Sequence, residues 1–322
     1  MKRKLLIGSA VSAAFLYLAL RGIQWSEFAS VLERTRYVQL ALAVFFTMLG
    51  HYLRAFRWRF MLSPIKQVPM SSAFSATSIG FMTSNLLPAR IGEVVRAFAI
   101  GKSESISKSA AFATIVYERM VDVFVILICL WWVLLKISGP PWLRNGGFVI
   151  LAANVAFLIL LFVLERYRGQ AGSLVQRIAA KLPSRLRDMV IGSSDRFFDG
   201  LQVVSQGRTL LPIAVVSLAV WYAALLGFYF CFSALQLELP QVAAATLVVI
   251  VAFGSMIPSA PAYLGTMQYA CVVGLAIFNI EKSEALAYSL LYHATQFFPI
   301  TIVGLYYMWR SHIRLSEVTK NR

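Results

Sequence analysis

Long apolar runs constrain this chain more than any other feature of its sequence. Residues 38–61, 108–136, 147–164 and 210–235 each form an apolar run of about the length of a membrane span. As a helix, about 20 residues cross the ~30 Å hydrocarbon core of a bilayer. Hydrophobic residues make up 59% of the 322 residues and charged residues only 14%, an unusual composition for a soluble domain. The sequence therefore predicts an all-α polytopic membrane protein.

Six apolar runs are predicted to cross the membrane fully: these four, residues 5–20 and residues 285–309. Two further apolar segments, residues 70–101 and 241–280, are too long and too interrupted for one straight helix. Irregular backbone at membrane depth is tolerated only where protein or a cavity surrounds it. Each of these two segments is therefore predicted to be a re-entrant helical hairpin. Residues 1–322 are expected to form a single transmembrane domain.

The two hairpins resemble each other at the residues that interrupt them. Both contain the pattern Pro-Ala-x-x-Gly, and the spans that follow, residues 111–123 and 287–299, align after a two-residue shift. The hairpin breaks are expected at Asn85, Pro88, Gly92, Pro258, Pro261 and Gly265. We therefore predict two repeat halves, at about residues 38–164 and 210–309. Chance similarity between two apolar segments is the alternative.

Basic residues predict how the chain is oriented. The formal net charge is +16, from 30 Lys+Arg against 14 Asp+Glu. With six full spans, 20 of the basic residues, Arg57 among them, fall on one side of the membrane and five on the other. Because cytoplasmic flanks are rich in Lys and Arg, both termini are predicted to be cytoplasmic. The two halves are then inverted, an arrangement typical of secondary transporters.

The first apolar run and the long polar segment each need a separate interpretation. Residues 5–20 are interpreted as an uncleaved span, not as a signal peptide, because Arg21 and Gly22 follow in place of a small-residue cleavage site. Residues 165–208 are polar and basic, and apolar residues recur in them every four positions from Leu174 to Leu186. This pattern predicts an amphipathic cytoplasmic segment on an anionic membrane surface, with a plain basic loop as the alternative.

Ionisable side chains at membrane depth are candidates for function because each is costly to place there. The candidate substrate-binding residues are Arg90, Glu93, Arg96, Glu118, Arg119, Asp122 and His293. Arginines match the geometry of phosphate, so they would hold an anionic headgroup, while the carboxylates balance their charge or carry protons. The alternative is a structural network with the pairs Glu93–Arg96 and Arg119–Asp122. His51 and Arg54 are weaker candidates, and Arg54 is expected to snorkel to the cytoplasmic interface.

The runs LLPARIGEVVRAFAI (residues 86–100) and SKSAAFATIVYERMVD (residues 107–122) resemble a known family. It is the family of flippase-like membrane proteins named for the membrane region of lysylphosphatidylglycerol synthase. Its pattern is a Pro-x-x-x-Gly-Glu-x-x-Arg hairpin, a span with Glu-Arg-x-x-Asp, and a second Pro/Gly hairpin late in the chain. Ala262 stands here where the family usually has Gly, and Gln268 stands near an expected acid. The resemblance implies movement of lipids between leaflets, and a location in a bacterial inner membrane.

The leading hypothesis is a flippase for an anionic lipid or a lipid-linked precursor. One alternative is a membrane-embedded glycosyl or lipid transferase that uses a polyprenyl-phosphate donor, and another is a proton-coupled small-solute transporter. The expected partners are a phospholipid or polyprenyl-linked lipid, a lipid-modifying enzyme and a second copy of the chain. No nucleic-acid partner, metal, cofactor or catalytic residue is expected, because the sequence contains no motif for them.

Overall fold

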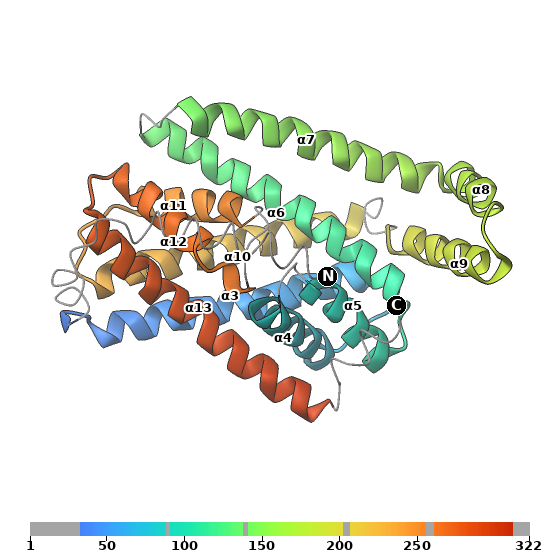
Figure 1. The fold of residues 1–322 in the computed structure, drawn as a ribbon, viewed down its shortest axis with the longest axis horizontal. Coiled ribbons are helices and arrows are strands. Elements are labelled where there is room, and N and C mark those ends of the chain that lie inside the picture. Colours follow the sequence, from blue (N-terminus) through green and yellow to red (C-terminus); the bar gives the residue numbers. More distant parts are fainter. Residues whose placement is uncertain (1–32, 88–90, 138–140, 202–206, 256–260, 312–322) are drawn as a thin grey trace.

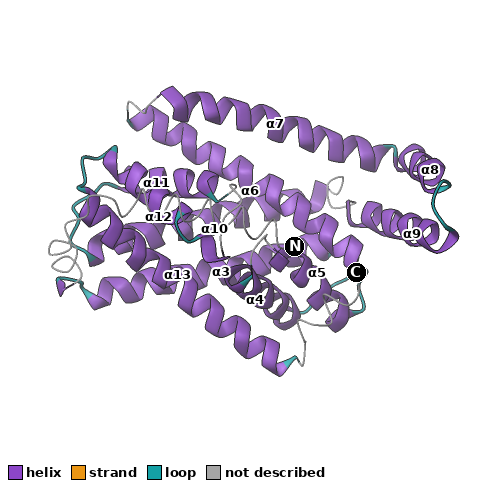
Figure 2. Ribbon diagram, viewed as in Figure 1, coloured by secondary structure: helices purple, strands orange, loops and turns teal. Residues whose placement is uncertain are grey.

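The computed structural model describes residues 33–87, 91–137, 141–201, 207–255 and 261–311. Every regular element in these ranges is a helix (Figures 1 and 2). The predicted first span, together with Pro88, Arg90 and Pro258, lies outside the described residues.

The first five helices follow the predicted spans closely. They are α3 (Tyr37–Leu62), α4 (Met70–Leu86), α5 (Ile91–Glu104), α6 (Lys108–Lys136) and α7 (Pro141–Arg166). The predicted span 108–136 coincides with α6. In contrast, α7 begins six residues before the predicted start of its span, at Pro141, because the fixed φ of proline suits the first turn of a helix.

The rest of the described chain contains two surface helices and a second series that repeats the order of the first. These elements are α8 (Arg168–Ala179), α9 (Ser184–Leu201), α10 (Gly207–Ala234), α11 (Gln241–Gly254), the short 3-10 helix η2 (Pro261–Tyr263), α12 (Thr266–Ala276) and α13 (Lys282–Arg310). The described part of the predicted polar segment therefore forms two helices joined by a turn.

Helix length separates two classes of element. Three helices, α3, α7 and α10, are long and apolar enough to cross a membrane by length and composition. The helices α6 and α13 have 29 residues each, about 44 Å at 1.5 Å per residue. The arms of the two hairpins have only 17, 14, 14 and 11 residues, so each is shorter than a ~30 Å hydrocarbon core. The chain is thus a polytopic membrane protein whose described elements are all helical, and six full spans with two re-entrant hairpins stay a prediction.

The two hairpins open toward opposite ends of the molecule. The N–H of Arg36 donates to the carbonyl of Ala234 at 2.7 Å, so the start of α3 meets the end of α10. Lys66 donates to the carbonyl of Glu104 at 2.7 Å, so the hairpin α4–α5 begins and ends where α3 ends. The hairpin α11–α12 follows α10 and lies at the other end (Figure 1).

Helix contacts in the two series correspond pair by pair. The most extensive helix–helix contact joins α3 to α10. Each hairpin packs on the helix before it and on the helix after it. In addition, α4 packs against α13 and α11 packs against α6. Each hairpin therefore contacts the long final helix of the other series, which is the packing that a two-fold repeat would produce.

Glycine and left-handed backbone occur in the described residues beside the breaks of the two hairpins. A side chain at Gly92 would collide with the backbone of Gly80, so glycine permits the close contact of α5 with α4. Gly265 has φ 84° and precedes α12. Ala262 and Tyr263, both with φ 57°, also adopt the left-handed region although they are not glycine. This conformation is energetically costly for residues other than glycine, so the segment directly before α12 is strained at Ala262 and Tyr263.

Candidate functional site

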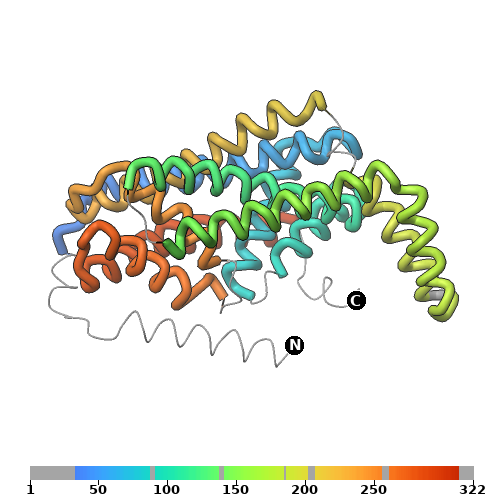
Figure 3. Tube along the Cα trace, turned by 90° about the horizontal axis from the view of Figure 1, so that it is seen from above, coloured from blue at the N-terminus to red at the C-terminus, as the bar shows by residue number. Residues whose placement is uncertain are grey.

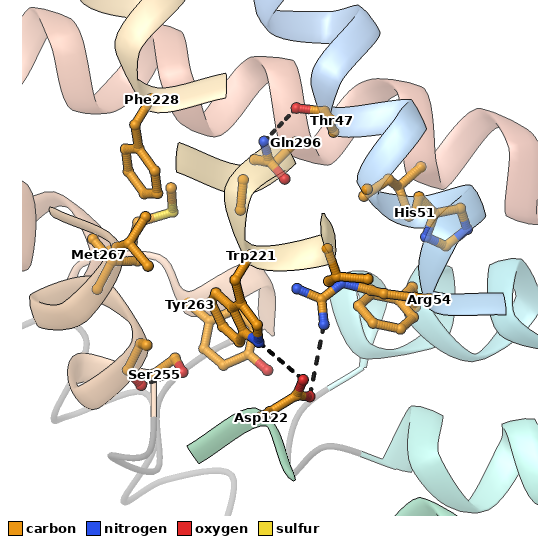
Figure 4. A pocket seen from close by; sticks show the side chains of 18 of the residues that line it. Thr47, His51, Arg54, Asp122, Trp221, Phe228, Ser255, Tyr263, Met267 and Gln296 are labelled. Carbon is orange, nitrogen blue, oxygen red and sulfur yellow. Dashed lines mark hydrogen bonds and ion pairs between the residues drawn. The ribbon is translucent and has the colours of Figure 1, made fainter. Parts of the chain in front are cut away.

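A cavity of about 560 Å³ lies between the two helix series. Its walls come from α3, α4 and α6 on one side and from α10, α11, η2, α12 and α13 on the other. The polar side chains that line it include Thr47, Arg54, Arg119, Asp122, His293 and Gln296. Aromatic rings, among them Phe81 and Phe228, line much of the rest. Figure 4 shows this cavity from close by.

Asp122 is the carboxylate at the cationic side of the cavity. Its Oδ1 accepts hydrogen bonds from Arg57 at 2.7 Å and from the indole of Trp221 at 3.0 Å. Its Oδ2 lies 3.5 Å from Arg119 and 3.8 Å from Arg54. Four groups on three helices, α3, α6 and α10, therefore converge on one carboxylate.

Glu118 forms the second centre of the same network, one helical turn before Asp122 on α6. It accepts hydrogen bonds from Arg96 at 2.9 Å and from Arg119 at 2.8 Å, and Arg57 lies 3.1 Å from it. The side chains of Arg57 and Glu118 have no exposed area. The ring of Trp58 covers the Arg96 guanidinium at 3.8 Å, a cation–π contact. The ion pairs therefore join α3, α5 and α6 in the interior.

The network carries an excess of positive charge. Among the described residues it contains four arginines and three carboxylates: Arg54, Arg57, Arg96 and Arg119 against Glu93, Glu118 and Asp122. Two of these arginines, Arg54 and Arg119, line the cavity. The buried pairs must compensate one another to offset their desolvation, and the remaining positive charge faces the cavity.

The predicted substrate-binding residues divide into two groups. Arg119, Asp122 and His293 line the cavity, whereas Glu93, Arg96 and Glu118 do not. The latter three lie in the network behind it, where Arg96 pairs with Glu118 and Glu93 lies 3.7 Å from Arg119. Of the two pairs in the structural alternative, Arg119–Asp122 is present, and Arg96 has Glu118 in place of Glu93.

Four of the six predicted hairpin-break residues lie within the described part of the chain. Asn85 lines the cavity and donates to the hydroxyl of Thr301 at 3.0 Å, which ties α4 to α13. Gly92 lies in the first turn of α5, Pro261 in η2 and Gly265 directly before α12. These residues shape the two hairpins around the cavity.

Sequence reasoning missed or undervalued two arginines of α3. Arg57 was grouped with the cytoplasmic flank, but its side chain is fully buried between two carboxylates, so that assignment is wrong. Arg54, expected to snorkel to the interface, has a side chain only 16% exposed that lines the cavity. The signal was the three-residue spacing of His51, Arg54 and Arg57, which places them on one helix face.

The second series has a neutral contact where the first has an ion pair. Arg96 on α5 binds Glu118 on α6, and in the same relation Gln268 on α12 binds His293 on α13. The Gln268 amide nitrogen lies 2.9 Å from His293 Nδ1, and its oxygen accepts from the Gly265 N–H at 2.7 Å. The two sides of the cavity therefore differ in charge.

Comparison with known proteins gives three relatives of note, all archaeal. A UPF0104 membrane protein of Methanothermobacter thermautotrophicus is 23% identical over 84% of this chain and 83% of its own length. The UPF0104 membrane protein MJ1595 of Methanocaldococcus jannaschii is 21% identical over 91% of both chains. Glycosyltransferase AglD of Haloferax volcanii is 24% identical over 94% of this chain but 54% of its own length. The bacterial membrane expected above stays a prediction.

A family model gives the wider relationship. The model that describes the lysylphosphatidylglycerol synthase TM region matches residues 5–304, nearly the whole chain. The residues that carried the resemblance in the sequence are those of the α4–α5 hairpin and α6, which hold the buried ion pairs. This chain is therefore a member of the lysylphosphatidylglycerol synthase TM region family.

Proposed function

We propose that the protein moves an anionic lipid or a lipid-linked precursor between the two leaflets of its membrane. One observation carries the proposal: a cavity of about 560 Å³ lies between two corresponding helix series and is lined by Arg54 and Arg119. Ligand pockets typically have volumes of roughly 300–1,000 Å³, so a lipid headgroup fits this one. The acyl chains would stay in the bilayer.

The charge of the site favours an anionic ligand. Arg54 is the least closely paired arginine of the network, at 3.8 Å from a carboxylate that Arg57 already binds at 2.7 Å. A phosphate at Arg54 and Arg119 would compensate the excess positive charge. Guanidinium groups match phosphate oxygens in geometry as well as in charge, which makes arginine suited to this role.

Movement between leaflets requires a site that opens to each side in turn. Secondary transporters achieve this with inverted repeats whose interrupted helices meet near the middle of the membrane. We propose that α3–α6 and α10–α13 are such halves, with six full spans, two re-entrant hairpins and both termini in the cytoplasm. The opposite openings of the α4–α5 and α11–α12 hairpins support this arrangement.

Reconstitution tests the proposal directly. The purified protein is placed in liposomes that contain fluorescent phosphatidylglycerol, and a membrane-impermeant quencher reports how fast the lipid changes leaflet. Arg54→Gln and Arg119→Gln should each slow this movement by about tenfold or more, because each removes a charge-assisted hydrogen bond to the phosphate. Arg177→Gln, an exposed change on α8, is the matched control and should move lipid at the original rate.

Folding must be separated from binding in this experiment. Arg119 also holds Glu118 at 2.8 Å, so its replacement changes stability as well as the site. Arg54 is the sharper test, and its variant should melt within a few degrees of the original protein. Unchanged lipid movement in a well-folded Arg54→Gln protein would contradict the proposed site.

A transferase that uses a polyprenyl-phosphate donor is the second candidate. The name of the relative glycosyltransferase AglD favours it, although the chain corresponds to only about half of that relative. The same arginines would hold the phosphate of such a donor. Incubation of the purified protein with a polyprenyl-phosphate sugar, followed by mass spectrometry, separates the two: a covalently modified lipid product supports transfer, and lipid movement without product supports transport.

A further inference from the structure

The cavity contains a second polar region, and its side chains are uncharged amides, hydroxyls and imidazole. His293 and Gln296 line it from α13 and share a helix face at three-residue spacing. The Gln296 amide donates to the hydroxyl of Thr47 on α3. Thr47 precedes Arg54 by seven residues, about 10 Å along the helix. Figure 4 shows the Thr47–Gln296 pair apart from the Arg54–Asp122 pair.

The hydrogen bonds of Gln268 determine which nitrogen of His293 carries the proton. The backbone N–H of Gly265 can only donate, so the atom that it meets at 2.7 Å is the amide oxygen of Gln268. The amide nitrogen of Gln268 therefore points to His293 Nδ1 at 2.9 Å and donates to it. Since Nδ1 accepts, the neutral imidazole carries its hydrogen on Nε2.

This arrangement makes His293 a neutral hydrogen-bond donor. A second proton on Nδ1 would place an N–H against the N–H of the Gln268 amide. Rotation of that amide would relieve the conflict only by turning its NH₂ group toward the Gly265 N–H. His293 can therefore offer Nε2–H to a ligand, but this environment opposes a role as a proton carrier. An N–H donor of this kind suits a hydroxyl or phosphate oxygen.

The cavity offers no open carboxylate to a cationic ligand within the described part of the chain. Asp122 is the only acidic residue among the described residues that line it. Its Oδ1 accepts hydrogen bonds from Arg57 at 2.7 Å and from Trp221 at 3.0 Å. Its Oδ2 accepts no hydrogen bond from the described residues, but it is buried and lies 3.5 Å from Arg119 and 3.8 Å from Arg54, so it is not open to a ligand. An ammonium group in the cavity would face the excess positive charge of the network without a carboxylate partner, which is unfavourable in a buried site.

From these contacts we infer that the cavity selects a phosphoester whose head is an uncharged polyol, such as phosphoglycerol or a phosphosugar, over one that carries an ammonium group. The phosphate lies at Arg54, and hydroxyls of the polyol reach His293 and Gln296. This inference rests on the proposed function, because it specifies the headgroup of the lipid that is moved. It makes lysylphosphatidylglycerol, the lipid in the family's name, a poor ligand of this chain.

The test measures binding to the full-length protein in an uncharged detergent by calorimetry. The probes are short-chain phosphatidylglycerol, phosphatidic acid, phosphatidylethanolamine and lysylphosphatidylglycerol, with glycerol 3-phosphate as the soluble competitor. Phosphatidylglycerol should bind at least about tenfold more tightly than the two lipids with ammonium groups, since one well-placed polar contact changes affinity by about that factor.

A pair of substitutions isolates the His293 donor. His293→Phe keeps an aromatic ring but removes Nε2–H, so phosphatidylglycerol should bind about tenfold more weakly while phosphatidic acid, which has no polyol, is unaffected. His293→Gln retains an N–H donor and should keep most of the affinity. Gln268 is a positioning residue: ¹⁵N NMR of labelled histidine should show the Nε2–H form of His293, and Gln268→Leu should produce a mixture of tautomers.

These experiments distinguish a failure of the headgroup inference from a failure of the proposed function. Equal affinity for phosphatidylglycerol, phosphatidylethanolamine and lysylphosphatidylglycerol would overturn the inference, while continued lipid movement would leave the proposed function standing. An Nδ1–H form of His293 in the original protein would also overturn it. Displacement of phosphatidylglycerol by equimolar glycerol 3-phosphate would support the headgroup chemistry but contradict lipid transport.

Discussion

Arg57 connects the two carboxylates of α6 to α3 and to α10. Besides Asp122 and Glu118, its guanidinium binds the hydroxyl of Ser217 on α10 at 3.0 Å. The side chain has no exposed area. The carboxylates compensate the buried positive charge of Arg57, and Arg57 in turn compensates their negative charges.

Arg57→Leu should therefore lower the free energy of unfolding by about 3–5 kcal/mol, because it leaves buried carboxylates without compensation. The measurement is the melting temperature and the chemical midpoint of the purified protein in detergent. Arg177→Leu on the exposed face of α8 is the control, with an expected change within about 0.5 kcal/mol. Equal melting temperatures for the two variants would show that the network contributes little to stability.

Ala262 is a position where a substitution should stabilise the protein. It adopts φ 57°, a conformation that disfavours a residue with Cβ, at the position where the family usually has glycine. Ala262→Gly should raise the free energy of unfolding by up to about 1 kcal/mol. Ala252→Gly, the same change inside α11, should lower it by about 0.5–1 kcal/mol. A loss of stability in both variants would refute the strain at Ala262.

Residue types and spacing predicted part of the site. Glu118, Arg119 and Asp122 were recognised because charged groups are unusual within an apolar run. The spacing of His51, Arg54 and Arg57 indicates a shared helix face, but it does not show that this face is buried, because the basic residues that follow Arg57 resemble a cytoplasmic flank. Only the packing of α3 on α6 and α10 encloses that guanidinium.

At the scale of elements, α8 and α9 form an arm with exposed apolar side chains. The arm turns across the direction of α7 (Figure 3), and α9 packs against α6. Leu174 is 59% exposed, Ile178 62% and Met189 57%. Apolar side chains beside basic residues are typical of helices that lie in the membrane interface. We expect this arm to lie on an anionic lipid surface.

Site-specific labelling tests the position of the arm. In a protein whose native cysteines are replaced, an environment-sensitive dye at Ile178→Cys should shift to shorter wavelength in nanodiscs of anionic lipid. The same dye at Gln176→Cys should not, because two residues turn about 200° around a helix and place it on the opposite face. Identical spectra at the two positions, in anionic and in zwitterionic lipid, would contradict the expectation.

Element positions were predictable because apolar length and Pro/Gly interruptions act locally. The break in residues 70–101 separates α4 from α5, and that in residues 241–280 separates α11 from α12. The start of α7 was less predictable, since residues before 147 are polar enough to resemble a loop yet continue the helix from Pro141. Tertiary packing decides such boundaries.

Across the whole molecule, the two helix series interlock. The contacts of α4 with α13 and of α11 with α6 cross from one series to the other. Similar Pro-Ala-x-x-Gly patterns predicted two related halves, but they contain no information about which helices of different halves touch. The cavity forms only where these crossed contacts bring the halves together, so its walls could not be assigned from the sequence.

The crossed packing also determines when the fold can be completed during synthesis. The hydrogen bond from Asn85 to Thr301 spans 216 residues, so α4 enters the membrane long before its partner has been translated. At about 5–20 residues per second, ribosomes need roughly 10–40 s to make the intervening chain. During that time the amide of Asn85 lacks this partner. The contact of α4 with α13 can therefore form only after the last helix of the second series has been synthesised.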